Sequence, residues 1–364
     1  MTDKVAVALL FGGRSSEHSI SCATAAGVLA AIDRDRYDVI PIGITREGAF
    51  TLQPDDAARF ALNPDALPQV EDNGSRIAWP DSAASRELAV VTADGARASL
   101  GAVDVVFPIL HGPWGEDGTV QGMLDLVGLP YVGSGVLASA LGMDKHFTKT
   151  VLQQAGIPVA PWQTVTAYRW RLDPESVRSA SERLGLPVFV KPARAGSSVG
   201  VSKVTSWDDL GAAIDTALAE DDRVLIEAAV VGREVEIAVL GGRPGEPARA
   251  SVAGEIVISG RDFYDFAAKY LDAPGIELVC PAELTDAELA DLGDLGVRAF
   301  DAIGAEGLSR VDFFLTADGF VVNEINTMPG FTPISMFPRC WQESGLAYPE
   351  LIDELIQVAL ARAA

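Results

Sequence analysis

Cysteine is scarce in this chain of 364 residues, and Cys22, Cys280 and Cys340 lie far apart with no Cys-x-x-Cys spacing. An odd, scattered set excludes a disulfide scaffold and a cysteine-based zinc site, and it fits reduced thiols in a cytoplasmic enzyme. Long apolar runs are missing too, since none approaches the roughly 20 residues that span a bilayer. The first such run, Val5–Phe11, leads into Gly-Gly-Arg-Ser-Ser-Glu rather than a cleavage site. We therefore expect a cytoplasmic protein.

Positive charge is in short supply, because 28 Lys and Arg face 51 Asp and Glu and the net charge is −23. This imbalance argues against a nucleic-acid partner and against docking on an anionic membrane. A hydrophobic fraction of 48% with 22% charged residues is ordinary for a globular protein. The length predicts two or three domains.

The N-terminal region predicts a βαβ unit. Lys4–Phe11 forms a buried parallel strand, a helix capped by Ser15 or Ser16 follows, and Val39–Ile44 forms the second strand. Ligands bind at the carboxyl ends of such strands, so Glu17 is a candidate partner for an ammonium group, or serves only the helix dipole. The segment lacks Gly-x-Gly-x-x-Gly spacing, which makes a dinucleotide site a weak prediction.

A second buried strand, Val103–Leu110, ends at His111 in a loop with three glycines, a common place for ligands. His111 is therefore a secondary site candidate, with hydrogen bonding of the loop as the alternative. Residues 46–100 read as an insertion, with short strands near Arg76–Trp79 and Leu88–Thr92. A boundary is expected near Asp144.

Beyond that boundary a strand carries Lys191 into a loop rich in Gly and Ser, a combination that lets backbone N–H groups and one positive charge meet phosphate oxygens. A later strand, Val224–Ala228, carries Glu227. Residues 261–270 are polar and aromatic, which is typical of a lid over a site.

Ser309–Gly330 carries the most specific pattern, because two runs rich in Val, Phe and Ile flank the loop Ala317-Asp318-Gly319. That loop pairs Asp312 with Glu324 and Arg310 with Asn326, and strand alternation puts these four on one face. The alternative is a surface hairpin with solvated charges. Two carboxylates and an amide carbonyl, without His or Cys, suit Mg²⁺. The opposite, buried face is predicted to hold Val311, Phe313, Leu315, Val321 and Ile325.

These elements follow one another in a characteristic order, and longer motifs surround them. The motifs are Phe11–Glu17, His111-Gly112 with Gly115–Thr119, Gly133–Gly135, Gly142–Lys145, Gly196–Gly200 and Asn323–Gly330. The ordered elements resemble the ATP-grasp superfamily, and the motifs resemble the D-alanine–D-alanine ligase family over almost the whole chain.

The resemblance implies an α/β and α+β fold, in which an N-terminal Rossmann-like parallel α/β domain precedes an ATP-grasp fold of two α+β subdomains. The first domain would span residues 1–143, with the insertion around 46–100. The central subdomain would span 144–227, and the C-terminal subdomain, with the lid loop and the metal hairpin, 228–364.

The activity implied by the resemblance is ATP-dependent ligation of two D-alanine molecules through an acyl phosphate, releasing ADP and phosphate, for peptidoglycan precursors of the cell wall. ATP and two Mg²⁺ ions, or Mn²⁺ in their place, are the implied cofactors. The implied partners are these small molecules and a second copy in a homodimer.

The resemblance also implies a role for each site residue. Asp312, Glu324 and Asn326 would hold the metal, and Arg310 with the Gly330 N–H would stabilise the oxyanion. The first D-alanine's ammonium would bind Glu17, which Ser197 and Tyr270 link to the lid, while the other substrate-side residues would be His111, Ser335 for the second carboxylate, and Met336. The nucleotide would contact Lys145, Lys191, Ser198, Glu227, Glu234 and Lys269.

Two positions depart from the family pattern: Ala195 stands where many members have Glu, and Met336 where Leu is common. Neither removes a ligand, so they bear on fine specificity. Alternatives are D-alanine–D-lactate ligation, against which Tyr270 argues, and an ATP-grasp ligase of other amino acids. Two further classes are an oxidoreductase that uses Gly12–Glu17, and a nucleotide-binding module without catalysis.

Overall fold

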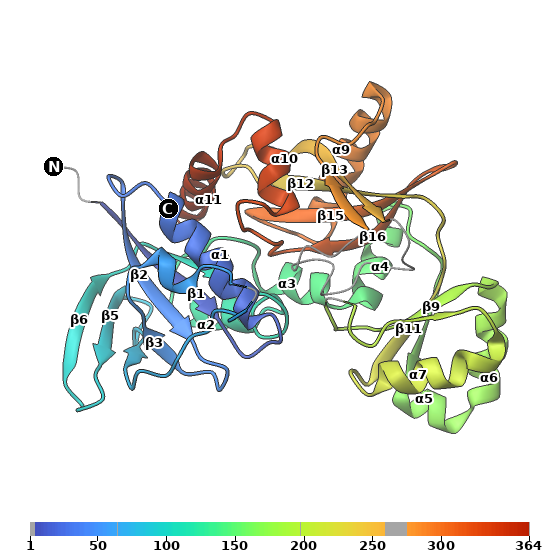
Figure 1. The fold of residues 1–364 in the computed structure, drawn as a ribbon, viewed down its shortest axis with the longest axis horizontal. Coiled ribbons are helices and arrows are strands. Elements are labelled where there is room, and N and C mark those ends of the chain that lie inside the picture. The colour runs from blue at the N-terminus through green and yellow to red at the C-terminus, as the bar shows by residue number, and fades with distance from the viewer. Residues whose placement is uncertain (1–3, 64, 197, 259–274, 364) are drawn as a thin grey trace.

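The computed structural model describes residues 4–63, 65–196, 198–258 and 275–363. The sheets and helices of these ranges form three groups in space, called here the N-terminal, the central and the third group (Figure 1). No helix within the ranges combines the length and apolar composition that crossing a membrane requires. The strands are β1 Val5–Gly12, β2 Tyr37–Ile44, β3 Phe50–Leu52, β4 Arg76–Ala78, β5 Glu87–Val91, β6 Arg97–Ala102, β7 Val105–Ile109, β8 Trp162–Thr166, β9 Val188–Pro192, β10 Ser202–Val204, β11 Arg223–Ala228, β12 Arg233–Leu240, β13 Arg249–Ile258, β14 Ile276–Val279, β15 Leu308–Thr316 and β16 Gly319–Asn326. The helices are α1 His18–Ala31, α2 Thr119–Leu126, α3 Val136–Met143, α4 Lys145–Gln154, α5 Ala167–Leu172, α6 Pro174–Ser181, α7 Leu210–Leu218, α9 Asp286–Ala302, α10 Met336–Glu343 and α11 Tyr348–Arg362.

A sheet of order β3-β2-β1-β7 forms the centre of the N-terminal group, with β1 parallel to both β2 and β7. The apolar run of β1 is almost wholly buried, which confirms the predicted parallel strand. The predicted serine cap of α1 was wrong. The helix begins at His18, directly after the N-cap residue Glu17. The Ser15 hydroxyl does not cap the helix and donates to the His111 carbonyl over 2.7 Å.

The segment around 46–100 adds β3 to the edge of this sheet and forms a separate antiparallel sheet, β4-β5-β6, at the left of Figure 1. Strands occur where the short runs Arg76–Trp79 and Leu88–Thr92 predicted them. This sheet lies at the far end of the molecule from the central group (Figure 1), while Phe60 and Val70 of the same segment join the core of the N-terminal group.

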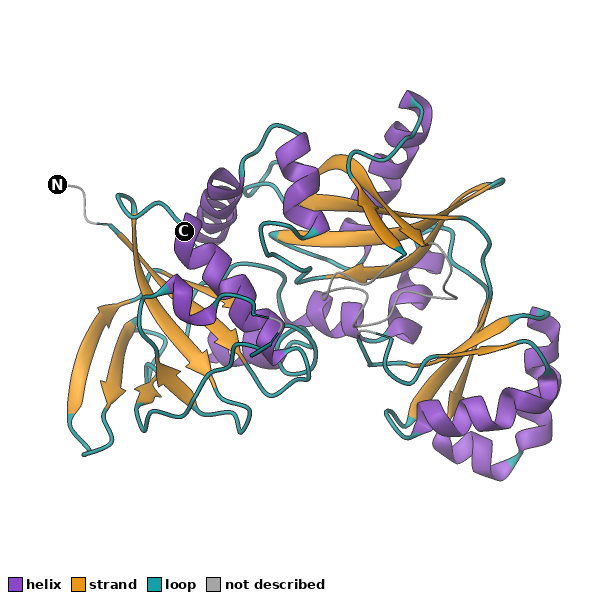
Figure 2. Ribbon diagram, in the orientation of Figure 1, coloured by secondary structure: helices purple, strands orange, loops and turns teal. Residues whose placement is uncertain are grey.

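The central group is an antiparallel sheet of order β10-β9-β11-β8. Helices α5, α6 and α7 cover one face of it (Figure 2), and Val177, Ile214 and Ala217 bury their side chains there with the sheet's valines. The other face stays open towards the rest of the molecule, and it carries Lys191 and Glu227.

The third group is an antiparallel sheet of order β14-β13-β12-β15-β16. Helix α9, which starts at a capping box formed by Thr285 and Glu288, packs on one face together with α3 and α4. On the other face α10 packs against β12 and β13, and this core continues into the N-terminal sheet through α11. The sequence patterns did not indicate that β12 and β13 are neighbouring strands of one sheet.

Cores link parts of the chain that lie on either side of the predicted boundaries at residues 143 and 227. Helix α4, expected in the central subdomain, places Leu152 in the core of the third group. Helix α11, expected in the C-terminal subdomain, places Leu351 and Leu355 in the core shared with the N-terminal sheet. The N-terminal group and the third group are thus fixed to each other by a shared core, while the sheet of the central group keeps its own core.

The β15–β16 hairpin has the predicted pairing but a different turn. Asp312 pairs with Glu324 and Arg310 with Asn326, as expected. Thr316, however, pairs with Gly319, so the loop has two residues, and a bulge between Asp312 and Phe313 restores the register. Between the turn and the bulge, the side-chain alternation of β16 is shifted by one residue from the predicted one. Phe320 and Val322 are therefore buried, and the prediction of a buried Val321 was wrong.

Candidate active site

A cavity of about 550 Å³ lies where the three groups meet, and all of them contribute to its lining. The N-terminal group supplies Glu17 and His111, the central sheet Lys191 and Glu227, and the hairpin its polar face. Of the predicted residues within the described ranges, those lining the cavity are Glu17, His111, Lys145, Lys191, Ser198, Glu227, Glu234, Arg310, Asp312, Glu324, Asn326 and Gly330.

Arg310 is the centre of the polar face of the hairpin. Its Nε and Nη2 donate to the two carboxylate oxygens of Asp312 over 2.6 and 2.7 Å, and Nε also lies 3.1 Å from Glu236 Oε2. The Asn326 amide donates to Asp312 Oδ2 over 3.1 Å. Although burial opposes the charge, the carboxylates of Asp312, Glu236 and Glu324 hold the pKa of Arg310 well above its usual value. The guanidinium is therefore a permanent positive charge facing the cavity.

The opposite wall is formed by two lysines that share one carboxylate. Lys191 Nζ donates to Glu227 Oε1 over 3.0 Å, and Lys149 Nζ lies 3.2 Å from Oε2. Burial alone would raise the pKa of Glu227, but the two ammonium groups lower it. The carboxylate thus stays ionised and fixes both lysines in the wall of the cavity.

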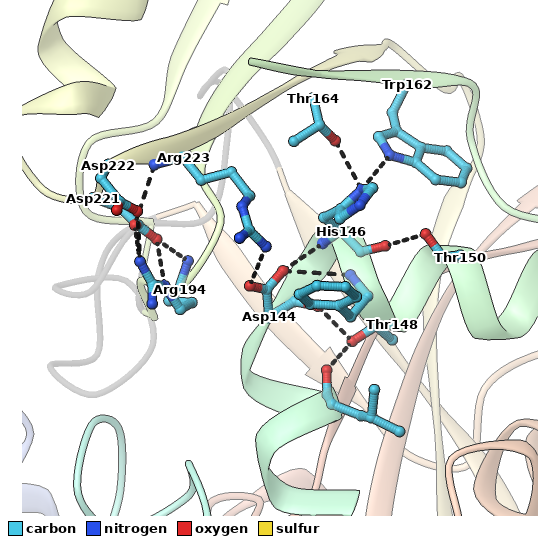
Figure 3. A network of polar contacts seen from close by, with 12 residues as sticks. Asp144, His146, Thr148, Thr150, Trp162, Thr164, Arg194, Asp221, Asp222 and Arg223 are labelled. Carbon is cyan, nitrogen blue, oxygen red and sulfur yellow. Dashed lines mark hydrogen bonds and ion pairs between the residues drawn. The ribbon is translucent and has the colours of Figure 1, made fainter. Parts of the chain in front are cut away.

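Asp144 anchors the start of α4, which carries Lys145 and Lys149 (Figure 3). Its carboxylate accepts from the His146 and Phe147 amides over 3.0 and 3.3 Å, and from Arg223 Nη1 of β11 over 3.0 Å. A carboxylate at this position satisfies two amides of the first turn and complements the helix dipole. The network ties α4 to the central sheet, although the other end of the helix packs on the third group.

His146 makes a second contact of the same kind, since Thr164 Oγ1 of β8 lies 2.9 Å from its Nδ1 (Figure 3). Lys145 reaches back over the Gly/Ser loop, donating from Nζ to the Ala195 carbonyl over 2.6 Å. Its own backbone N–H donates to the Ala193 carbonyl over 3.0 Å. The loop that follows Lys191 is therefore held by the helix that carries the other lysines.

Glu17 lies between two glycine-containing loops: a Cβ on Gly112 would be 2.8 Å from its Oε2, and one on Gly196 would be 3.5 Å away. Only a residue without a side chain fits Gly112 here, which also has a positive φ of 73°. The buried Glu17 carboxylate thus reaches from the N-terminal group to the loop of the central sheet, at the cavity wall.

His111 holds the loop after the hairpin, because its Nδ1 lies 3.1 Å from the Met328 carbonyl and its Nε2 3.5 Å from Thr24 Oγ1. Burial lowers the pKa of His111, against the opposing field of Glu17, so the ring is neutral at pH 7. A neutral ring with both nitrogens engaged positions the Met328–Gly330 backbone; this is the alternative role that the sequence left open.

Ser335 and Met336 lie behind that backbone and do not line the cavity. The Ser335 hydroxyl accepts from the Thr332 amide over 3.1 Å, and a Cβ on Gly330 would be 3.2 Å from it. Met336 is buried against β13, where a Cβ on Gly254 would lie 2.1 Å from its Sδ. Met336 therefore fixes α10 to the sheet rather than facing the cavity.

Ser197, Lys269 and Tyr270, and with them the predicted lid at 261–270, lie outside the described residues. Among the charged residues of the cavity, the sequence reasoning missed Lys149, Lys203, Glu116 and Glu236. Lys149 could have been found, since it lies one turn after Lys145 on the same helix face. Glu236 follows Glu234 by two residues on one strand and pairs with Asp312. Glu116 lay within the motif Gly115–Thr119, but nothing in its local sequence assigned it a role.

Glu116 is an acid in the wall of the cavity with a raised pKa. Burial and the nearby Glu17 charge raise the pKa of Glu116 to about 8, although the Gly112 amide donates to its Oε2 over 2.5 Å. At pH 7 most of this carboxyl is neutral, so it can donate a hydrogen bond beside the Glu17 carboxylate.

Comparison with known proteins agrees with this arrangement. Residues 6–134 match the model of the D-ala D-ala ligase N-terminus, and residues 151–357 that of the D-ala D-ala ligase C-terminus. A D-alanine–D-alanine ligase of Pseudarthrobacter chlorophenolicus is 55% identical over 99% of this chain and 95% of its own length. One of Streptomyces griseus is 51% identical over 99% of this chain and 93% of its own.

Solved structures are similar in fold. A D-alanine–D-alanine ligase of Coxiella burnetii superposes with a TM-score of 0.82 at 34% identity, covering 100% of this chain and 95% of that one. A D-Ala:D-Ser ligase of Enterococcus faecalis gives 0.83 at 32% identity, covering 98% of this chain and all of the other.

An antiparallel sheet that carries lysines faces an acidic hairpin across one cavity, and a parallel α/β domain lies beside them. This arrangement defines a ligase with the ATP-grasp fold. The predicted fold class is confirmed. With matches of this identity along its whole length, the chain belongs to the D-alanine–D-alanine ligase family.

Proposed function

We propose that the chain joins two D-alanine molecules at the expense of ATP, giving D-alanyl-D-alanine, ADP and phosphate for peptidoglycan synthesis. The observation that carries this proposal is the single cavity in which the Glu17 carboxylate, the Lys191 ammonium and the Arg310 guanidinium converge from three separate groups of the fold. A carboxylate suits the ammonium of an amino acid, a lysine suits phosphate, and the guanidinium suits a developing oxyanion.

The first step forms an acyl phosphate when the carboxylate of one D-alanine attacks the γ-phosphate of ATP. Lys145 and Lys191 neutralise charge on the phosphates, and the backbone near Ser198 borders the same loop. Glu227 fixes Lys191 and contacts the base side of the nucleotide, while Glu234 contacts the ribose. Glu17 holds the ammonium of the first D-alanine, so its carboxylate points towards the phosphates.

The second step is the attack of the other D-alanine's amine on the acyl carbon, after which phosphate leaves. Arg310 and the Gly330 N–H stabilise the negative oxygen of the tetrahedral intermediate, an effect of about 3–4 kcal/mol per donor. Ser335, which does not line the cavity in this structure but has its hydroxyl beside Gly330, is the proposed contact of the second D-alanine's carboxylate. Met336 contributes indirectly, since it fixes the start of α10 behind Ser335.

The hairpin fits Mg²⁺ by the chemistry of its side chains: Asp312, Glu324 and Asn326 offer hard oxygen atoms on one face of adjacent strands. Among the described residues, no group of three or more His, Cys, Asp or Glu side chains is placed to bind a metal, so the amide of Asn326 is needed to complete this set. Two Mg²⁺ ions, or Mn²⁺ in their place, would neutralise the ATP phosphates when bound. Asp312 is meanwhile oriented by Arg310.

We also propose that the enzyme acts in the cytoplasm as a homodimer. The test of the function is phosphate release with Mg-ATP and D-alanine, beside L-alanine, D-serine, D-lactate plus D-alanine, and no amino acid. D-alanine-dependent phosphate with an equal amount of D-alanyl-D-alanine is the expected result. Phosphate release that requires a different amino acid would replace the substrate, and the absence of turnover on every pair would overturn the proposal.

A further inference from the structure

Two cysteines far apart in the sequence meet beside the third sheet, on the face against which α10 packs. Cys280 directly follows β14 and is half-buried, whereas Cys340 is a buried residue of α10. Their Sγ atoms are 3.7 Å apart, within the distance of a sulfur hydrogen bond. The third cysteine, Cys22, is buried in α1 and belongs to the core of the N-terminal group.

We propose that Cys280 and Cys340 form a site of reversible oxidation, in which a peroxide converts the thiol pair into a disulfide that lowers ligase activity. A disulfide needs the sulfurs to approach from 3.7 Å to about 2.05 Å, which a small shift of α10 against the end of β14 achieves. The effect on activity rests on the proposed function, whereas formation of the disulfide does not.

The surroundings keep the two sulfurs facing each other. At its end α10 is bound to β13 by the Ser344 hydroxyl, which accepts from the Val252 amide over 2.8 Å. The turn after β14 is bound to the same strand, since the Ala282 amide donates to the Ala253 carbonyl over 2.8 Å. Both cysteines are thus attached to β13 by their neighbours, which makes the encounter a fixed feature of the fold.

The pair is chemically unequal. The hydrogen bond with Cys340 and the positive charge of Arg339 lower the pKa of Cys280, while the same hydrogen bond and burial raise the pKa of Cys340. Thiolates are the reactive form, and they react when accessible. Cys280, which is both more acidic and more exposed, is therefore the thiol that meets the oxidant, and Cys340 is the one that resolves it.

The reaction balances with peroxide as the only oxidant. The Cys280 thiolate attacks one peroxide oxygen, the O–O bond breaks, and a sulfenic acid forms while the departing hydroxide takes a proton to become water. The Cys340 sulfur then attacks the sulfenic sulfur, the S–S bond forms, and the second hydroxide leaves as water with the Cys340 proton. Two thiols lose two electrons and two protons, and the peroxide is reduced to two waters.

The disulfide would act on the active site through α10. This helix begins at Met336, next to Ser335 and the Gly330 backbone, and Cys340 lies one turn further along it. Helix α10 also packs against β12, the strand that carries Glu236. Moving α10 shifts the groups proposed to hold the second D-alanine, so turnover should fall more than ATP affinity.

The experiment treats the full-length protein with hydrogen peroxide and compares it with Cys280→Ser, Cys340→Ala and the matched control Cys22→Ala. Peptide mapping without reductant should find the Cys280–Cys340 crosslink in the wild type and in the Cys22 variant only, with one free thiol left in the wild type. Turnover should fall with the crosslink and return on adding dithiothreitol. Because Cys280 is half-buried, its variant carries the test even if the Cys340 variant does not fold.

Oxidation of Cys280 to sulfinic acid with no crosslink would overturn the site. A crosslink that leaves turnover unchanged would overturn its effect on activity. Equal loss of activity in the Cys280 variant would show that peroxide acts elsewhere in the enzyme. The crosslink is measured by mass, so it is decided independently of whether D-alanine is the substrate.

Discussion

Replacing Glu227 by Gln removes the charge that holds two lysines in the wall of the cavity while keeping the size of the side chain. Glu227 and Lys149 are each 3% exposed, and the two Nζ atoms lie 3.0 and 3.2 Å from the carboxylate oxygens. Without the carboxylate, Lys149 keeps the Ala160 carbonyl, 3.3 Å from its Nζ, and the Trp162 ring, whose centroid lies 5.6 Å from Nζ. The variant thus leaves a buried ammonium without a counter-charge.

The expected loss is about 3–5 kcal/mol in the free energy of unfolding, the range found when one partner of a buried ion pair is removed. A matched control is Glu182→Gln, which removes a carboxylate 3.4 Å from Arg178 where the side chains are 41% and 46% exposed. Exposed pairs contribute about 0–1 kcal/mol, so the control should stay close to wild type.

The loss should shrink as the pH rises above neutral. Burial lowers the pKa of Lys149, and Glu227 opposes that shift, so its removal lowers the pKa further. Between that lowered pKa and the ordinary value of about 10.4, the unfolded chain binds more protons than the folded chain. The free energy of unfolding then increases with pH. In the variant this increase begins at a lower pH than in the wild type.

Urea unfolding of the three proteins at pH 7 and pH 9 measures both effects. The expected result is a large deficit for Glu227→Gln at pH 7, a smaller one at pH 9, and little change for the control. If the two variants lost the same small amount at pH 7, the Lys149–Glu227–Lys191 cluster would not be a buried charge network. A deficit that is constant with pH would assign the loss to packing instead.

Three further predictions concern the cavity. Arg310→Met should lower turnover by roughly 10²–10³-fold, the effect of one oxyanion donor, with little change in ATP affinity; equal losses in both would make Arg310 a ground-state ligand of ATP. Glu324→Ala should abolish magnesium-dependent turnover, while Asp318→Ala in the exposed turn of the same hairpin should keep it; near-normal activity of the Glu324 variant would place the metal elsewhere. Glu116→Gln should raise the melting temperature more at pH 9 than at pH 5, because burial raises the pKa of Glu116 to about 8. A raised carboxyl pKa makes the wild type lose stability as the pH rises from about 4.3 to 8, so a gain independent of pH would contradict that pKa.

Much of the site could be predicted because its residues sit in runs with a fixed side-chain period. Alternation along the hairpin put Arg310, Asp312, Glu324 and Asn326 on one face, and the structure confirms their pairing. The turn was wrong by one residue, and the bulge compensated for it. A bulge depends on how the strand twists against its neighbours, which the local pattern does not specify.

The residues that were missed share a different property. Lys149 and Glu116 acquire their chemistry from burial beside groups that are distant in the sequence: Glu227 for the lysine, and Glu17 for the acid. In the sequence each is an ordinary charged residue near a helix. The shift in pKa exists only once the fold removes water from both partners.

The sequence by itself determined the elements and the chemical types of the site, because strand and helix periods, glycine loops and acidic pairs are local features of the chain. Only the tertiary structure decided which of these features meet. Helix α4 packs on the sheet of the third group, while its Lys149 reaches Glu227 of the central sheet. The fold likewise brings Cys280 next to Cys340. Those encounters depend on the cores that α4, α10 and α11 share with distant strands, and burial in such cores is a property of the whole chain.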